Sequence, residues 1–443
     1  MYLTKRFSIL PWLFTGMMIL TAFSSCAGAG AGKGENSGDG LSAPTWQQLS
    51  KFLGDAEPDD QRGWSVAIDG NTAIVGIPSD DVNGITNAGS AYIFVRDGAG
   101  TWTWANTLTA SDAGEYDLFG VSVALSGDYA IVGAHHHNGP SDSPFAPDGK
   151  NIRSGAAYVF VRTSTSVWLE ETKLIGERDW FQQEDHFGSS VAISGDTAVV
   201  GSPNDEYGDV NPDSGAVYVF RRDDEGNWPQ ETRLTAADAS AGDNFGSSVA
   251  IDGDSLIIGA PFDDYRDYSS GSAYIFTREG GGWKQIKLSP DSRADHLFGL
   301  SVAIEKDTAI VGAPQGRDFR DVRTGSAYLF VKTDEGTWSL SDTLTPSGGA
   351  EGIVFGWSTA IAEDSIVIGA IGDGKNSSGS VYVFTNNDGE SWTQSGKFFA
   401  ADAAFNTWFG FGISISGQSV IIGAPNDNGG GYHSGAAYFF ALR

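Results

Sequence analysis

The most concentrated group of potential metal ligands in the sequence is the run His135-His136-His137. Neutral imidazole is a common ligand of zinc and copper, so this run could form part of a metal site. The other histidines stand singly elsewhere in the chain: His186, His296 and His433. Without a second group of ligands we favour a solvated loop and expect no cofactor; a metal site at His135, His136 and His137 is the alternative.

Aspartates gather in two sets of loops that recur along the chain. The first set, after Gly-Ala-Pro-like segments, comprises Asp80, Asp81, Asp205, Asp209, Asp263, Asp264, Asp267, Asp318, Asp321, Asp373 and Asp427. The second set, before Phe-Gly pairs, comprises Asp112, Asp117, Asp185, Asp238, Asp243, Asp291, Asp295 and Asp402. We favour turn chemistry, because Asp accepts backbone N–H bonds and tolerates unusual dihedrals. The alternative is an acidic rim that attracts cations or a basic partner.

Motifs of familiar enzymes are missing from the sequence. The segment from Gly369 to Lys375 fits most of a phosphate-binding loop, but Asn376 replaces the required Ser or Thr and no helix is expected after it. The sequence contains no GxSxG nucleophile elbow and no HExxH zinc motif. We therefore expect a non-enzymatic protein, while the abundant acidic residues leave a glycan hydrolase with paired carboxylates open.

These residues are carried by a unit of about 58 residues that recurs seven times. Its anchoring glycines are Gly63, Gly120, Gly188, Gly246, Gly299, Gly356 and Gly410. Each unit contains four short apolar, β-branched or aromatic runs separated by turn residues; in the third unit these span 189–193, 197–202, 216–221 and 228–234. The pattern predicts an all-β fold, a seven-bladed β-propeller of four-stranded antiparallel blades over residues 44–443.

The two ends of this region complement each other. The last unit stops at Arg443 without its Trp-containing fourth run, whereas a matching run from Thr45 to Phe52 precedes the first anchor. We expect the N-terminal strand to complete the seventh blade.

The repeated segments resemble the FG-GAP repeat of integrin α-subunit propellers and related bacterial surface proteins. The FG element is present in six units, from Phe119-Gly120 to Phe409-Gly410, and Arg62-Gly63 is the divergent copy. The GAP element is intact at Gly259-Ala260-Pro261, Gly312-Ala313-Pro314 and Gly423-Ala424-Pro425. The resemblance implies a propeller and an adhesion-like function. The family's calcium sites are not expected here. The first two strands of each unit are joined by tight turns such as Asp69-Gly70-Asn71 and not by the family's DxDxDG cage.

One sector of the expected ring is aromatic. The residues directly after the seven anchors are Trp64, Val121, Ser189, Ser247, Leu300, Trp357 and Phe411, so units 6, 7 and 1 are aromatic neighbours, and Trp408 and Phe405 precede the seventh anchor. We favour packing between blades, since large aromatics are usually buried. The alternative is an arc that binds a sugar ring or a side chain, with Trp64, Trp357, Phe411 and Trp408 as its residues.

The first 26 residues read as a secretory signal, with Lys5 and Arg6 before an apolar run. Phe23-Ser24-Ser25-Cys26 resembles a bacterial lipobox, with Phe where Leu is usual, and predicts lipidation of Cys26; ordinary cleavage in the following Ala-Gly repeat is the alternative. Residues 27–43 are Gly-rich and predict a flexible tether. The membrane is thus expected to be contacted only through a lipid anchor, in the outer membrane or at the cell surface.

Composition narrows the range of partners. The formal net charge of −29 makes nucleic acid an improbable ligand, because binding of phosphates rests on Lys and Arg. We expect an exported monomer that binds a protein or a glycan at the cell envelope through its loop-rich face. A carbohydrate-binding or carbohydrate-active propeller and a structural scaffold in an envelope complex are the alternatives.

Overall fold

The computed structural model describes residues 46–54, 57–138, 153–176, 184–206, 212–264, 270–288, 290, 297–316, 322–386 and 391–442. The predicted signal, the tether and Cys26 fall outside these residues. The chain divides into two units, residues 1–43 and 44–443, and the strands that the structure describes lie in the second. No helix in the described segments is long and apolar enough to cross a membrane.

Seven antiparallel four-stranded sheets make up residues 46–442, and each is one blade. Blade 1 contains β2 (Val66–Asp69), β3 (Thr72–Ile77), β4 (Ser90–Arg96) and β5 (Trp102–Leu108). Blade 2 contains β6 (Ser122–Ser126), β7 (Tyr129–Ala134), β8 (Ala156–Ser164) and β9 (Val167–Leu174). Blade 3 contains β10 (Ser190–Ser194), β11 (Thr197–Ser202), β12 (Ala216–Arg221) and β13 (Gln230–Leu234). Blade 4 contains β14 (Ser248–Asp252), β15 (Ser255–Ala260), β16 (Ser272–Glu279) and β17 (Gly282–Leu288).

The remaining blades follow the same order. Blade 5 contains β18 (Ser301–Glu305), β19 (Thr308–Ala313), β20 (Ser326–Lys332) and β21 (Trp338–Leu344). Blade 6 contains β22 (Phe355–Ala362), β23 (Ser365–Ala370), β24 (Ser380–Thr385) and β25 (Thr393–Phe398), with a short 3-10 turn, η3 (Lys375–Ser377), between β23 and β24. Blade 7 contains β26 (Ile413–Ser416), β27 (Ser419–Ala424), β28 (Ala436–Leu442) and β1 (Trp46–Phe52).

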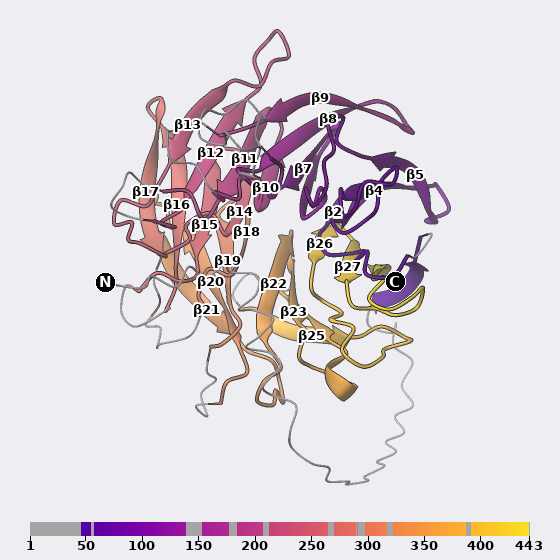
Figure 1. The fold of residues 1–443 in the computed structure, drawn as a ribbon. Coiled ribbons are helices and arrows are strands. Elements are labelled where there is room, and N and C mark those ends of the chain that lie inside the picture. The colour runs from indigo at the N-terminus through magenta and orange to yellow at the C-terminus, as the bar shows by residue number, and fades with distance from the viewer. Residues whose placement is uncertain are drawn as a thin grey trace, which may run out of the picture. The chain divides into compact units, whose positions relative to one another are not determined.

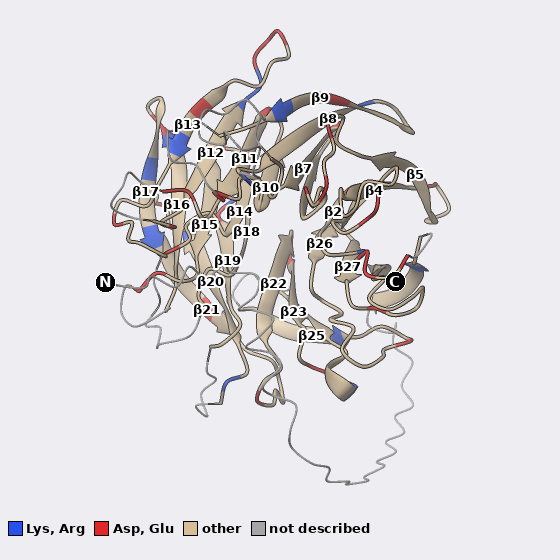
Figure 2. Ribbon diagram, viewed as in Figure 1, with Lys and Arg blue, Asp and Glu red and all other residues tan. Residues whose placement is uncertain are grey.

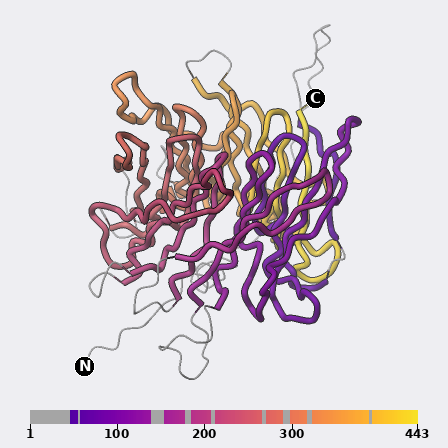
Figure 3. Tube along the Cα trace, turned by 90° about the horizontal axis from the view of Figure 1, so that it is seen from above, coloured from indigo at the N-terminus to yellow at the C-terminus, as the bar shows by residue number. Residues whose placement is uncertain are grey.

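The blades form a closed ring around a central axis (Figures 1 and 3). The first strands of successive blades are neighbours, β2 beside β6 and so on to β26 beside β2. β1 pairs antiparallel with β28, from Trp46 opposite Leu442 to Phe52 opposite Ala437. The prediction that the N-terminal strand completes the seventh blade is therefore confirmed, together with the propeller fold.

Tight turns and glycine anchors give each blade its shape. The predicted turns between first and second strands are present, with Gly70, Gly127, Gly195, Gly253 and Gly417 at φ between +52° and +57°. The anchor Gly120 has φ +96°, and a Cβ there would collide with the carbonyl oxygen of Ser90. Only glycine lets the backbone of one blade approach the next this closely.

The core is a series of layers between adjacent blades. The Phe of each FG element packs edge-on against the Tyr and Phe of the third strand, as Phe245 does against Tyr274 at 5.3 Å and Phe276 at 6.0 Å between ring centroids. Such pairs add to the large apolar area that aromatic rings bury. Four tryptophans at or near the start of outer strands are also buried: Trp102, Trp168, Trp228 and Trp338.

Candidate functional site

Two sets of loops meet on one side of the ring, which we call the loop face. They are the loops between second and third strands and the loops that join blades. Backbone bridges connect them, for example between Gly89 of blade 1 and Phe119 at the start of blade 2, and between Gly155 and Phe187 one blade further. The predicted ligand residues and aspartates in the described segments belong to this face.

The four predicted aromatic residues form one cluster, the aromatic arc: Trp64, Trp357, Trp408 and Phe411. Phe411 lies at its centre, with ring centroids 4.7 Å from Trp64 and 5.4 Å from Trp357. Trp408 stacks on Phe411 at 5.8 Å with an interplanar angle of 11°. Trp408 is buried and the other three are half-buried, so the arc both packs between blades and presents ring surface.

The backbone holds the arc in place through the turn around each anchor. The amide of Phe411 donates to the carbonyl of Trp408 at 3.0 Å, and Trp408 has φ +58°. The amide of Trp64 donates in the same way to Gln61. The indole N–H of Trp408 donates to Asn406 Oδ1 at 3.0 Å. In blades 2 to 5 the corresponding residues after the anchor are Val, Ser, Ser and Leu, so this position is aromatic only in blades 6, 7 and 1.

Three exposed rings also occur in or beside the loops of blades 6 and 7. Phe405 lies in the loop before blade 7 and is 64% exposed. Tyr432, in the loop between β27 and β28, is 66% exposed and stacks on His433 at 3.9 Å. Phe399 directly follows β25 and is 59% exposed. Neither Tyr432 nor Phe399 was predicted from the sequence; a ring within the Gly-rich segment before His433 was a signal for Tyr432.

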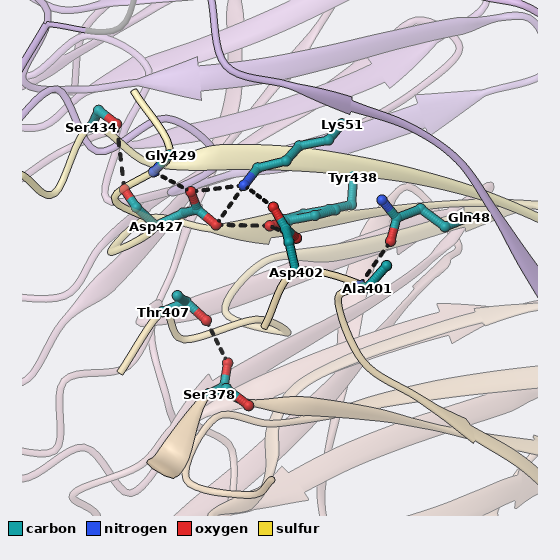
Figure 4. A network of polar contacts seen from close by, with 10 residues as sticks. All are labelled: Gln48, Lys51, Ser378, Ala401, Asp402, Thr407, Asp427, Gly429, Ser434 and Tyr438. Carbon is teal, nitrogen blue, oxygen red and sulfur yellow. Dashed lines mark hydrogen bonds and ion pairs between the residues drawn. The ribbon is translucent and has the colours of Figure 1, made fainter. Parts of the chain in front are cut away.

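The aspartates of blade 7 belong to a polar cluster that neither interpretation of the sequence anticipated (Figure 4). Lys51 Nζ of β1 donates to Asp402 at 2.6 Å and to Asp427 at 2.9 Å. The Tyr438 hydroxyl donates to Asp427 at 2.7 Å and to Asp402 at 3.0 Å. Lys51 also lies 5.2 Å from the centre of the Tyr438 ring. One cation and one phenol thus satisfy two carboxylates from two loops.

The same arrangement, which we call the Tyr-Asp-cation cluster, recurs in blade 4. Lys287 donates to Asp238 at 2.6 Å and to Asp263 at 2.7 Å, and the Tyr274 hydroxyl bonds both carboxylates. Reduced versions join Tyr218 and Arg233 to Asp205, and Tyr382 and Lys397 to Asp373. Figure 2 shows the basic residues on β13, β17 and β25.

Blade 2 replaces the loop aspartate of this cluster by His137. Lys173 on β9 donates to Asp112 at 2.8 Å and to His137 Nε2 at 2.6 Å, while His137 Nδ1 contacts Asp117 at 2.7 Å. These contacts fit a ring that carries its proton on Nδ1 and accepts from the lysine. In blades 1 and 5, Thr107 and Thr343 stand opposite the tyrosine in place of a cation. The sequence feature that marks a blade with a Tyr-Asp-cation cluster is a Lys or Arg directly before the last apolar residue of the outer strand.

Two of the carboxylates, those of Asp402 and Asp238, have lowered pKa values and are held as anions. Burial alone would raise the pKa of Asp402, but the hydrogen bond and charge of Lys51 outweigh it and the pKa is lowered. The pKa of Asp238 is lowered in the same way by Lys287. Burial and the carboxylates of Asp427 and Asp402 raise the pKa of Tyr438, so its hydroxyl stays a donor. Part of the acidic rim, which was the alternative interpretation of these aspartates, is therefore neutralised internally.

Other aspartates follow the favoured turn interpretation. Asp117 accepts the amide of Gly114, and Asp243 accepts that of Ser240, both at 2.7 Å. Asp243 is buried, and burial raises its pKa to about 6, with the charges of Asp263 and Asp238 adding to the effect. The aspartates at 209, 267, 291, 295, 318 and 321 lie outside the described residues.

Three histidines meet between blades 2 and 3, although they are not the predicted three. His135 and His136 lie beside His186, with ring centroids 4.2, 5.3 and 5.1 Å apart. Burial lowers the pKa of His136 to about 3 and that of His186 to about 4, and it also holds the pKa of His135 well below its usual value. Within the described segments, no three His, Cys, Asp or Glu side chains are already arranged as a metal site.

Comparison with known proteins agrees with the repeat structure. The FG-GAP repeat model matches residues 46–94, 102–160, 168–220, 228–276, 284–330, 338–384 and 392–440. The chain belongs to the FG-GAP repeat family. No curated protein sequence matches the chain. Each matched segment runs from the outer strand of one blade to the third strand of the next, so a set of seven FG-GAP repeats needs its first strand to complete the last blade.

Proposed function

We propose that this FG-GAP propeller is a non-enzymatic recognition module that binds a protein or glycan at the cell envelope. The observation that carries the proposal is the aromatic arc, because it gathers half-buried rings at one sector of the loop face. Loops on a rigid scaffold commonly carry binding residues, and aromatic residues in partly buried positions dominate interface energetics. The exposed rings of Phe405 and Tyr432 on the same sector extend the apolar surface available to a ligand.

The hydrogen bonds and ion pairs of the loop aspartates also favour the aromatic arc as the binding site. Asp402, Asp427, Asp238 and Asp263 are already bonded to Lys51 or Lys287 and to tyrosine hydroxyls. A cation or basic partner would have to displace these bonds to use them. We therefore propose binding through the aromatic arc and independent of calcium.

A carbohydrate-binding propeller is the second candidate, and the observation that favours it is the presence of two half-buried indoles, Trp64 and Trp357, on either side of Phe411. Flat aromatic faces suit stacking on sugar rings. A hydrolase would additionally need a pair of carboxylates at catalytic spacing. A scaffold in an envelope complex is the third candidate. We propose that the chain is exported, lipid-anchored through Cys26 and monomeric.

The proposal is tested by applying the purified protein to combined glycan and matrix-protein arrays, first with calcium and then with chelator. We expect one class of ligand to bind in both conditions. Competition by the soluble glycan would assign a glycan ligand, and binding that glycans leave unchanged would assign a protein. No binding in either condition would contradict the recognition proposal and leave the scaffold.

A further inference from the structure

The junction between blades 2 and 3 holds a side-chain cluster that the recognition function does not use. His135 and His136 follow β7 in blade 2, and His186 precedes the anchor of blade 3. The imidazole centroids are 4.2 to 5.3 Å apart. Half of the six histidines in the chain thus meet at one of seven equivalent junctions.

The fold itself does not require histidine at these positions. Where blade 2 has His135, five other blades have proline and blade 6 has Ile371. Blades 3 and 7 have Asn204 and Asn426 in place of His136. The counterparts of His186 are Gln61, Leu118, Asn244, Leu297, Val354 and Trp408. Because the sister blades fold with these residues, the three histidines are a local addition to the blade.

The cluster contains buried polar atoms that lack partners in the described structure. His135 is 2% exposed, and neither of its ring nitrogens has a hydrogen-bond partner. Oδ1 of Asp117, which is 1% exposed, also has none. Leaving such groups unsatisfied is costly, and a bound ion or water would relieve the cost. Imidazole binds metal ions through a ring nitrogen that carries no proton, and both ring nitrogens of His135 are without a partner in the described structure.

The spacing of the rings is close to that of a metal site. With zinc–nitrogen bonds of about 2.0–2.1 Å in a tetrahedral site, two bound imidazoles have centres about 5 Å apart. Two of the three observed separations, 5.3 and 5.1 Å, agree with this value. Among the described residues, no group of three His, Cys, Asp or Glu side chains is placed to hold a metal ion as it stands, so binding requires the rings to rotate about their side-chain bonds.

We propose that His135, His136 and His186 bind one divalent late transition-metal ion, Zn²⁺ or Cu²⁺, which links blade 2 to blade 3. Imidazole ligands suit these ions and not Ca²⁺ or Mg²⁺, which prefer oxygen. His136 is half-buried, so an open fourth position can be occupied by water. His137 is excluded from the ligand set because Asp117 and Lys173 already engage its nitrogens.

The charged residues near the three histidines predict whether a given substitution tightens or weakens metal binding. The negative charges of Asp117 and Glu184 act on His136 and His186 respectively, in the sense that favours a cation. The positive charge of Arg153 acts on all three histidines in the opposite sense. Replacing Arg153 by Gln should therefore tighten metal binding, whereas loss of a ligand should weaken it.

The test is isothermal titration of Zn²⁺ and Cu²⁺ into the purified protein, prepared without a polyhistidine tag, with Ca²⁺ as the comparison ion. We expect one site per chain and a melting temperature that Zn²⁺ raises. His186→Asn and His136→Asn, which install residues of sister blades, should weaken binding at least about tenfold. Arg153→Gln should strengthen it, and His433→Asn in blade 7 should change nothing.

Cu²⁺ spectra provide a second readout, because nitrogen coupling in the electron paramagnetic resonance signal reports imidazole ligation directly. Absence of a stoichiometric site in the wild type would overturn the proposal, as would binding that His186→Asn leaves unchanged while the variant melts normally. The array result for the aromatic arc does not bear on this outcome, since the arc lies in blades 6, 7 and 1.

Discussion

At the scale of single residues, Lys287 shows how the loop face keeps its acidic residues in place. Its ammonium is bonded to two carboxylates, of which Asp263 is 8% exposed, and it lies 5.2 Å from the centre of the Tyr274 ring. Removing one member of a buried ion pair leaves the other charge uncompensated, which costs more than the pair contributes when intact.

We therefore predict that Lys287→Met destabilises the protein by about 3 kcal/mol, measured by denaturant unfolding. Lys284→Met on the same strand is the matched control, because Lys284 is 61% exposed and its distance to Glu279 is 3.9 Å. It should cost well under about 1 kcal/mol. Equal effects of the two variants would show that the Tyr-Asp-cation cluster adds nothing beyond a surface charge.

Asp243 gives a prediction about pH. Its folded-state pKa of about 6 lies above the ordinary value for Asp, so the folded state binds its proton more tightly than the unfolded state. This residue's contribution to stability is therefore largest below about pH 4 and is lost as the pH rises to about 6. Asp243→Asn keeps an acceptor for the Ser240 amide and removes the titration.

The stability of Asp243→Asn relative to the wild type should accordingly rise by roughly 2 kcal/mol between pH 4 and pH 7. Urea unfolding at a series of pH values measures it. A constant difference across that range would mean that the carboxyl titrates normally in the folded protein.

At the scale of elements, β1 closes the ring with both its backbone and its side chains. It pairs with β28 along its length, Gln48 accepts the amide of Ala401, and Lys51 ties together two loops of blade 7. Beside this seam, Arg62 replaces the FG phenylalanine and forms a buried ion pair with Asp60 at 2.8 Å. The repeat thus departs from its pattern where the chain's two ends meet.

Deleting residues 44–54 should lower the melting temperature of the whole propeller, because blade 7 would lose its outer strand and Asp427 its cation. Deleting residues 27–43, the predicted tether, is the control and should leave melting unchanged. Differential scanning calorimetry of the two deletions measures this. If removal of the strand had no effect on melting, the closure would not be a structural requirement.

The strands show what local sequence can predict. The expected runs 197–202 and 216–221 coincide with β11 and β12. The expected run 228–234 begins two residues before β13, because Pro229 cannot donate to the ladder. The aromatic arc was predictable because Trp64, Trp357 and Phe411 occupy the same position in their repeats, directly after the anchoring glycine. The contact between Lys51 and Asp427 joins residues 376 apart in the sequence, so no local pattern predicts it. The same holds for His186 and His135, which lie together across a blade junction.

At the scale of the whole molecule, seven similar blades differ mainly in what their loops present. Blades 6, 7 and 1 present aromatic rings, the junction of blades 2 and 3 presents imidazoles, and five blades pair a tyrosine and a cation with a carboxylate. The net charge of −29 still makes the chain strongly acidic, which favours solubility and disfavours phosphate-rich partners.

The most direct test of recognition through the arc is the array signal of Trp64→Ala/Phe411→Ala beside that of Leu300→Ala. Leu300 is the half-buried counterpart of the arc residues in blade 5, and serine stands at this position in blades 3 and 4, so small residues are compatible with the fold. We predict that the double variant melts as a folded protein and loses the ligand, while Leu300→Ala keeps it. A folded double variant that binds like the wild type would contradict the account.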